Sequence, residues 1–200
     1  MKSQKVNSLG LTRYTGKAGL AALVVAATMT VVSSPAMAAP TCFTTPIAVP
    51  VTSAGIYINL FTGASNVAPG SVPSWDFNPW GASAGYFWPG TSTPLTGFVD
   101  GGTGVIQNLS NGQPVGPASA FLTGNASAAA MATWRIGITN GNLGVRFVEG
   151  GSTYYAWLNV TTGAASGLPI TLNNWCFDNT PDTAISVGTT PVSLQSFSID

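Results

Sequence analysis

The chain has no histidine and very few charged residues of any kind. Six lysine or arginine and six aspartate or glutamate side chains occur among its 200 residues. The absence of histidine excludes a Ser-His-Asp triad, a Cys-His pair and any histidine-based metal centre. The Walker phosphate loop and the glycine-rich dinucleotide fingerprint are also absent. Most of the side-chain sets that enzymes use are therefore missing, and no cofactor is expected.

The first 38 residues have the pattern of a secretory signal peptide. Four basic side chains within the first 17 residues precede a mostly apolar stretch over 20–32, and Ala36-Met37-Ala38 is a small-x-small cleavage site. The apolar stretch is shorter than the roughly 20 residues of a membrane anchor. We expect a cleaved signal over 1–38 and no membrane span after it. The mature chain, 39–200, is expected to be secreted or at the cell surface of a bacterium, or in its periplasm.

Removal of this signal leaves almost no positive charge. Arg135 and Arg146 are the only basic residues of 39–200, against six acidic ones, which gives a net charge of −4. A nucleic-acid interface needs a basic patch, and an anionic membrane would repel such a chain. Neither nucleic acid nor membrane is therefore an expected partner. If buried, each arginine needs a carboxylate or carbonyl partner. We expect each to pair with one of the six acidic side chains.

Cys42 and Cys176 are the only cysteines. In an exported chain two cysteines are expected to form a disulfide, which here would tie the start of the mature chain to a strand near its end. Two free buried thiols are the alternative. A metal site is disfavoured, because two thiolates are too few ligands.

Apolar residues after position 38 follow a period of two, which predicts strands rather than helices. In the best example, 154–160, Tyr154 and Leu158 share one face and Tyr155 and Trp157 share the other. The clearest predicted strands are 134–139, 143–148, 154–160 and 170–177, with turns at Asn140-Gly141 and at 149–152.

The other predicted elements are short. Strands are expected at 47–51, 55–61, 97–100 and 105–109, the last two as edge strands; 63–94 is expected to include a long ordered loop, 126–132 a helical turn or a loop, and 191–199 a last strand or a tail. Many short strands with regular turns predict one domain of antiparallel β-sandwich type, either jelly-roll or concanavalin-like.

Residues 142–188 resemble a pattern found in many secreted bacterial β-rich proteins. The pattern runs through a "GFRF"-like strand, a "YGW"-like strand, a "W-a-y-e" strand and an "I-x-x-G" ending. The counterparts here are Gly144-Val145-Arg146-Phe147, Tyr155-Ala156-Trp157, Trp175-Cys176-Phe177 and Ile185-Ser186-Val187-Gly188, with 56–63, 75–80 and 108–109 also similar.

Such proteins often carry a C-terminal surface-sorting tail of the PEP-CTERM kind. This chain departs from them there, since it ends in SLQSFSID without an apolar helix or a basic terminus. The resemblance implies an extracytoplasmic location and a β fold, and it implies no established activity. Release, or another mode of retention, is expected instead of sorting by such a tail.

The densest run of aromatic residues lies at 75–88. Sugars stack on aromatic faces, and aspartate and asparagine bind their hydroxyls, so this run is a candidate glycan site. Packing as a secondary core at one end of the sandwich is the alternative, and it is favoured. The candidate glycan-binding residues are Trp75, Asp76, Asn78, Trp80, Tyr86 and Trp88.

Carboxylates are the remaining candidates for chemistry. Glycoside hydrolysis needs two carboxyl groups at a suitable separation. Asp178 and Asp182 are a weak candidate Ca²⁺ site, although Asx residues beside a proline more often form a turn. The acids available for a catalytic pair are Asp76, Asp100, Glu149, Asp178 and Asp182.

The sequence thus favours a secreted, non-catalytic structural or adhesive protein, with an extracellular polysaccharide or a surface protein as partner. A carbohydrate-binding module that uses the 75–88 aromatic residues is the second hypothesis. A carboxylate-based glycoside hydrolase is the third and weakest.

Overall fold

Three long strands with alternating side chains form the centre of the fold. They are β10 (Gly141–Glu149), β11 (Ser152–Thr162) and β12 (Ile170–Phe177), paired antiparallel in that order. The structure is a computed structural model that describes residues 39–90 and 96–191. It confirms the strands predicted at 143–148, 154–160 and 170–177 and the turn at 149–152. The predicted signal, 1–38, lies outside the described residues.

The remaining elements are short strands and two 3₁₀ turns, η1 (Pro69–Ser71) and η2 (Ala132–Arg135). The strands are β1 (Thr41–Phe43), β2 (Ile47–Ala48), β3 (Tyr57–Ile58), β4 (Ser65–Asn66), β5 (Phe77–Trp80), β6 (Tyr86–Pro89), β7 (Gly97–Val99), β8 (Pro114–Val115), β9 (Phe121–Thr123) and β13 (Ile185–Ser186). None of the helical turns in 39–90 and 96–191 is long and apolar enough to cross a membrane.

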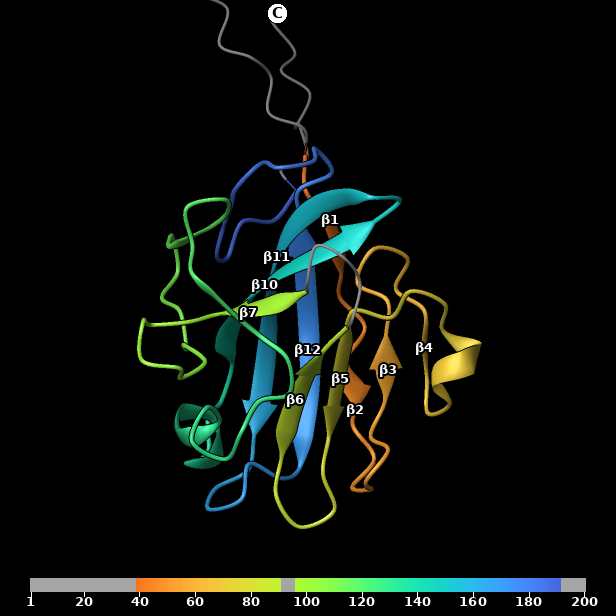
Figure 1. The fold of residues 1–200 in the computed structure, drawn as a ribbon, viewed down its shortest axis with the longest axis vertical. Helices are drawn as coiled ribbons and strands as arrows, with labels where there is room; N and C mark the ends of the chain where they lie inside the picture. The colour runs from red at the N-terminus through yellow and green to blue at the C-terminus, as the bar shows by residue number, and fades with distance from the viewer. Residues whose placement is uncertain (1–38, 91–95, 192–200) are drawn as a thin grey trace, which may run out of the picture. The chain divides into compact units, whose positions relative to one another are not determined.

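The strands form an all-β sandwich of antiparallel sheets (Figure 1). The larger sheet has the order β1-β12-β11-β10-β7-β9, with β2 also paired to β12. The second sheet has the order β4-β3-β5-β6, and β8 pairs with β13 in a small third sheet. The predicted fold class is therefore confirmed.

Both faces of the larger sheet are covered, so β11 buries side chains on both sides. Ala156 and Leu158 lie in the main core between the two sheets. Tyr155 and Trp157 lie on the opposite face, in a second cluster with Val115 of β8 and Ile185 of β13. The predicted split of β11 into two faces is thus confirmed, but neither face is left to solvent.

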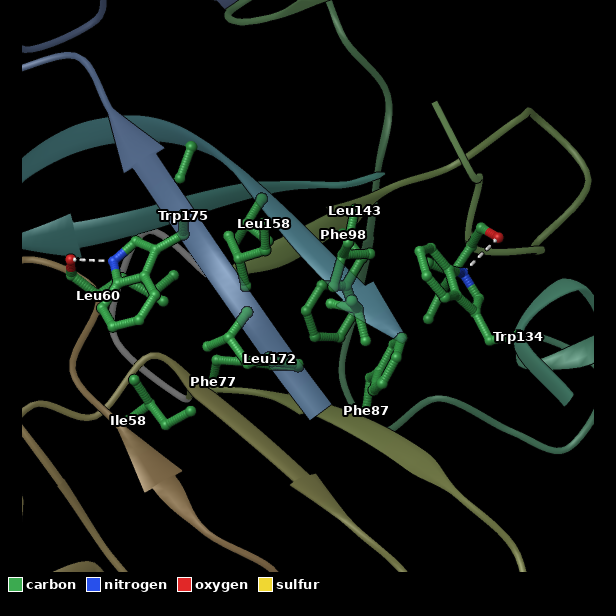
Figure 2. Packing of buried hydrophobic residues seen from close by; sticks show 14 of the residues in the cluster. Ile58, Leu60, Phe77, Phe87, Phe98, Trp134, Leu143, Leu158, Leu172 and Trp175 are labelled. Atoms are coloured by element: carbon green, nitrogen blue, oxygen red, sulfur yellow. Dashed lines mark hydrogen bonds between the residues drawn. The ribbon is translucent and has the colours of Figure 1, made fainter. Parts of the chain in front are cut away.

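The main core joins the two sheets through large side chains and a few neutral hydrogen bonds (Figure 2). The indole nitrogen of Trp175 donates to the carbonyl of Leu60 at 2.9 Å, and that of Trp134 donates to the carbonyl of Ile106 at 3.1 Å. Both bonds are buried, so each satisfies two polar groups that would otherwise be costly to remove from water.

The disulfide between Cys42 and Cys176 is present, as predicted. The two residues stand directly opposite each other in the β1–β12 ladder, with a Cα–Cα distance of 4.1 Å. The bond therefore fastens the first described strand, at the edge of the sheet, to the long strand β12, across a sequence separation of 134 residues.

One prediction about local structure is wrong. Residues 134–139 do not form a strand: the backbone turns through η2, Gly137 adopts a φ of +87°, and the side chain of Ile136 is 70 % exposed. The ordered loop expected within 63–94 is present at 67–76, which contains η1, and β5 and β6 form a hairpin after it. Bulky aromatic residues favour such a pleated, half-buried ladder despite the nearby glycines and prolines.

Smaller differences concern four segments. The predicted edge strand at 97–100 is an inner strand, β7, while 105–109 contributes only isolated bridges. The segment 126–132 forms a turn that leads into η2. Most of 191–199 lies outside the described residues.

Removal of the disulfide is expected to lower the free energy of unfolding by about 4–5 kcal/mol, because the bond closes a very long loop in the unfolded chain. Thermal unfolding with and without a reductant measures this effect. The double variant Cys42→Ala/Cys176→Ala is the control, since reductant should leave its transition unchanged. Equal melting temperatures for the oxidised and the reduced wild-type protein would contradict the expectation.

Candidate functional site

Five aromatic side chains lie on the outward face of the sheet β4-β3-β5-β6. Phe77 and Phe87 are in the main core, so Trp80, Tyr86 and Trp88 alternate to the other face of β5 and β6, although Tyr86 also packs against the core. Trp75, which precedes β5, joins this face through its ring contacts. The same alternation turns Tyr57 outward, because Ile58 is in the core. All five outward rings are half-buried. This aromatic face consists of Tyr57, Trp75, Trp80, Tyr86 and Trp88.

The rings of the aromatic face form two groups. In the first, Trp75 contacts Tyr57 edge-on at 5.0 Å and Trp88 edge-on at 5.6 Å between ring centroids. In the second, Trp80 and Tyr86 stack at 4.7 Å. These spacings are those of favourable aromatic pairs, so the rings hold one another in place while part of each surface remains open.

Arg135 belongs to the second group and has a carbonyl as its partner. Its guanidinium donates to the oxygen of Gly85 through two nitrogens at 3.2 and 3.1 Å, and it lies 4.3 Å from the ring centroid of Tyr86. The expected pairing with a carboxylate is therefore wrong for this residue. The guanidinium of Arg146 lies 4.7 Å from the ring centroid of Phe121.

Asp76 and Asn78, the polar members of the predicted glycan site, are buried inside the sheet. Asn78 is 1 % exposed, and its amide nitrogen donates to the carbonyls of Ala54 and Ile56 at 2.9 Å each. Asp76 is fully buried, and its carboxylate accepts the backbone N–H of Leu60 at 2.9 Å. Asp76 therefore offers no polar atom to a ligand at the aromatic face, and the amide nitrogen of Asn78 is engaged by the neighbouring backbone.

The environment of Asp76 changes its acidity. Burial raises the pKa of this carboxyl from its ordinary 3.8 to about 7; the N–H of Leu60 opposes the rise and the nearby charge of Glu149 adds to it. One oxygen of Asp76 and one of Glu149 are buried without a hydrogen-bond partner among the described residues. Because Asp76 has no exposed surface, this pair of acids lacks the open cleft that a glycosidase requires.

The Ca²⁺ candidate forms a turn. Asp178 is buried and accepts the N–H of Thr180 at 2.7 Å, while Asp182 is exposed with a φ of +56°. Among the described residues no group of three or more histidine, cysteine, aspartate or glutamate side chains is arranged around a common point for a metal. The alternative that the sequence favoured, an Asx turn, describes Asp178, whose carboxylate accepts the N–H two residues further on.

Sequence reasoning missed a row of asparagines on the outer face of the larger sheet. Asn142 stands opposite Asn159, which in turn stands opposite Asn174, on the adjacent strands β10, β11 and β12. Strand pairing brings these three amides together from distant parts of the chain. The signal in the sequence is an asparagine within each of the three strongest strand patterns, but only the register shows that they meet.

The raised pKa of Asp76 makes stability depend on pH. Below about pH 4 the carboxyl is protonated in both the folded and the unfolded chain. Between about pH 4 and 7 the folded chain keeps a proton that the unfolded chain releases, so the free energy of unfolding falls as the pH rises. The slope from this group is at most about 1.4 kcal/mol per pH unit, and it vanishes above the folded-state pKa.

Asp76→Asn should remove that slope, because the amide still accepts the Leu60 N–H but does not titrate. Denaturant unfolding at several pH values measures it as the difference between variant and wild type. Asp100→Asn is the matched control, since Asp100 caps the Gly102–Gly104 turn at the surface. If the free energy of unfolding depends on pH in the same way for wild type and Asp76→Asn, then Asp76 does not titrate in this range.

Comparison with known proteins adds no assignment: no family model matches the chain, and neither a curated protein nor a solved structure is significantly similar to it. The resemblance to secreted bacterial β-rich proteins stays a prediction.

Proposed function

We propose that this chain is an extracellular, non-catalytic adhesive protein that holds neutral polysaccharide on its aromatic face. The observation that carries the proposal is the gathering of five half-buried rings on one outward sheet face. Protein surfaces that bind partners are enriched in tyrosine and tryptophan, because these rings supply contact area with little loss of side-chain entropy. The C–H faces of sugar rings suit such flat surfaces.

The ligand is proposed to be neutral because the aromatic face carries little charge. Asp76 and Asn78 are buried beneath it, and the one cation beside it, Arg135, is engaged with the carbonyl of Gly85. An acidic polysaccharide would need basic partners, and 39–200 contains only two basic residues. Dispersion contacts and hydroxyl hydrogen bonds are the interactions that remain.

The proposed location rests on the disulfide. A cross-strand disulfide between Cys42 and Cys176 is compatible with an oxidising compartment, either extracellular or periplasmic. The signal pattern over 1–38 supports export to the same compartments. A glycoside hydrolase is less favoured, since the carboxyl group with the most perturbed pKa, Asp76, is fully buried.

Trp88→Ala should reduce binding to neutral polysaccharide by about tenfold or more, the equivalent of roughly 1.4 kcal/mol of lost ring contact. Affinity electrophoresis in gels that contain a panel of neutral polysaccharides measures the change. Trp88→Phe, which keeps a ring, should retain most of the binding. Ile136→Ala removes an apolar side chain that is 70 % exposed outside the aromatic face, and it is the control.

The thermal transition of each variant shows whether it is folded. Unchanged retardation of a folded Trp88→Ala variant would overturn the use of this face. Wild-type protein that no polysaccharide of the panel retards would overturn the proposed function.

A further inference from the structure

A groove with a cavity volume of about 490 Å³ lies on the outer face of β10, β11 and β12. Two rows of side chains that cross the strands form its floor. The first row contains the three opposed asparagines of the larger sheet, and in the second Trp157 stands opposite Cys176 of the disulfide. This is the face of the larger sheet that points away from the main core. The lining of the groove includes five asparagines, Asn111, Asn140, Asn142, Asn159 and Asn174.

Hydrogen bonds hold several amides of the groove in fixed positions. Asn159 donates to the side-chain oxygen of Asn142 at 3.1 Å and to the carbonyl of Asn140 at 3.0 Å. Asn173 donates to the side-chain oxygens of Asn159 at 2.8 Å and Asn140 at 3.1 Å. Asn142 donates to Asn111 at 3.3 Å. The network orients these side chains without using any charge, and such order lowers the entropy lost on binding.

Other amide atoms in the groove make no hydrogen bond with the described part of the chain. The side chain of Asn174 makes no hydrogen bond with any described residue, although its neighbour Asn173 makes three. Asn111 and Asn140 accept hydrogen bonds through their side-chain oxygens, and their amide nitrogens donate to no described residue. The groove therefore presents both donors and acceptors from amides that are already positioned.

One wall of the groove is attached to its floor. The indole nitrogen of Trp157, which is 5 % exposed, donates to the carbonyl of Thr189 at 3.3 Å. The backbone N–H of Gly112 donates to the carbonyl of Val187 at 2.9 Å and holds the same segment from its other side. These bonds give the groove a defined wall, and the threonine hydroxyls of Thr44 and Thr190 add polar groups at its rim.

We infer that this groove is a second binding site of the protein, which takes a neutral, hydroxyl-rich carbohydrate chain. Among the residues that the structure describes, no lysine, arginine, aspartate or glutamate lines it, so a charged ligand would find no counter-charge there. A sugar hydroxyl both donates and accepts, and it therefore matches the free amides and the threonine hydroxyls. The buried indole and the disulfide supply the apolar base that such concave sites use.

The groove extends the function of the protein beyond the aromatic face. The aromatic face is the outer side of one sheet, and the groove is on the outer side of the other, with the main core between them. One molecule with both sites bridges two polysaccharide chains, as a cross-linking adhesive does, and its avidity for a multivalent surface exceeds the affinity of either site. The inference takes its ligand class, neutral carbohydrate, from the proposed function. The site itself is argued from the residues of the groove.

The test records side-chain amide and indole NMR signals of the oxidised, exported protein during titration with neutral hexasaccharides of glucose, xylose, mannose and galactose. We expect one of these sugars to shift the side-chain amide signals of Asn174 and Asn111. Shifts confined to the indole signals of Trp75 and Trp88 would overturn the groove and leave the aromatic face standing. Shifts confined to the groove amides would support the groove and overturn the aromatic face as a binding site. No shift with any sugar would overturn both sites.

A variant separates a functional role of Asn174 from a structural one. Asn174→Ala should weaken the groove titration by about tenfold, because a bound hydroxyl loses its partner. It should leave the indole shifts of Trp88 and the melting temperature unchanged, since Asn174 makes no hydrogen bond with the described protein. Asn125→Ala, at an exposed asparagine outside the groove, is the matched control. Equal groove affinities for Asn174→Ala and Asn125→Ala would overturn the inference.

Discussion

The scarcity of charge is the constraint on which most features of this structure depend. With two basic residues in 39–200, buried polar groups must be satisfied by neutral partners. The indole N–H groups of Trp134 and Trp175 therefore reach backbone carbonyls across the core. The guanidinium of Arg135 likewise bonds the carbonyl of Gly85. On the outer face of the larger sheet, a network of asparagine side chains supplies neutral hydrogen bonds.

The same constraint shapes the two candidate binding surfaces. β11 buries side chains on both of its faces, so the larger sheet contributes one face to the main core and the other to the second cluster. The second sheet closes the main core from the opposite side and turns its aromatic residues outward. The outer surfaces of the two sheets thus offer stacked rings on one side and fixed amides on the other. Both are suited to ligands that carry hydroxyls and no charge.

The sequence predicted the parts of the fold that depend on local patterns. Period-two alternation located β10, β11 and β12, and the cysteine count with an export signal predicted the disulfide. It failed where tertiary contacts overrode the pattern. Residues 134–139 alternate as a strand would, yet Trp134 is drawn into the core from a 3₁₀ turn and Gly137 takes a left-handed conformation. Four residues of the aromatic face were found from the sequence, and Tyr57 was not, because it reaches Trp75 from a separate strand. The asparagine row was not, because strand register joins amides that are far apart in the chain.

The most direct test of a neutral binding protein is the ionic-strength dependence of its affinity for polysaccharide. Isotherms for the best-bound polysaccharide should be measured at low and high sodium chloride. We expect nearly the same affinity at both, because stacking and hydroxyl hydrogen bonds are not screened by salt. A steep loss of affinity at high salt, with tightest binding to a charged polysaccharide, would contradict the account and would mean that the few charges of the chain, rather than its rings and amides, hold the ligand.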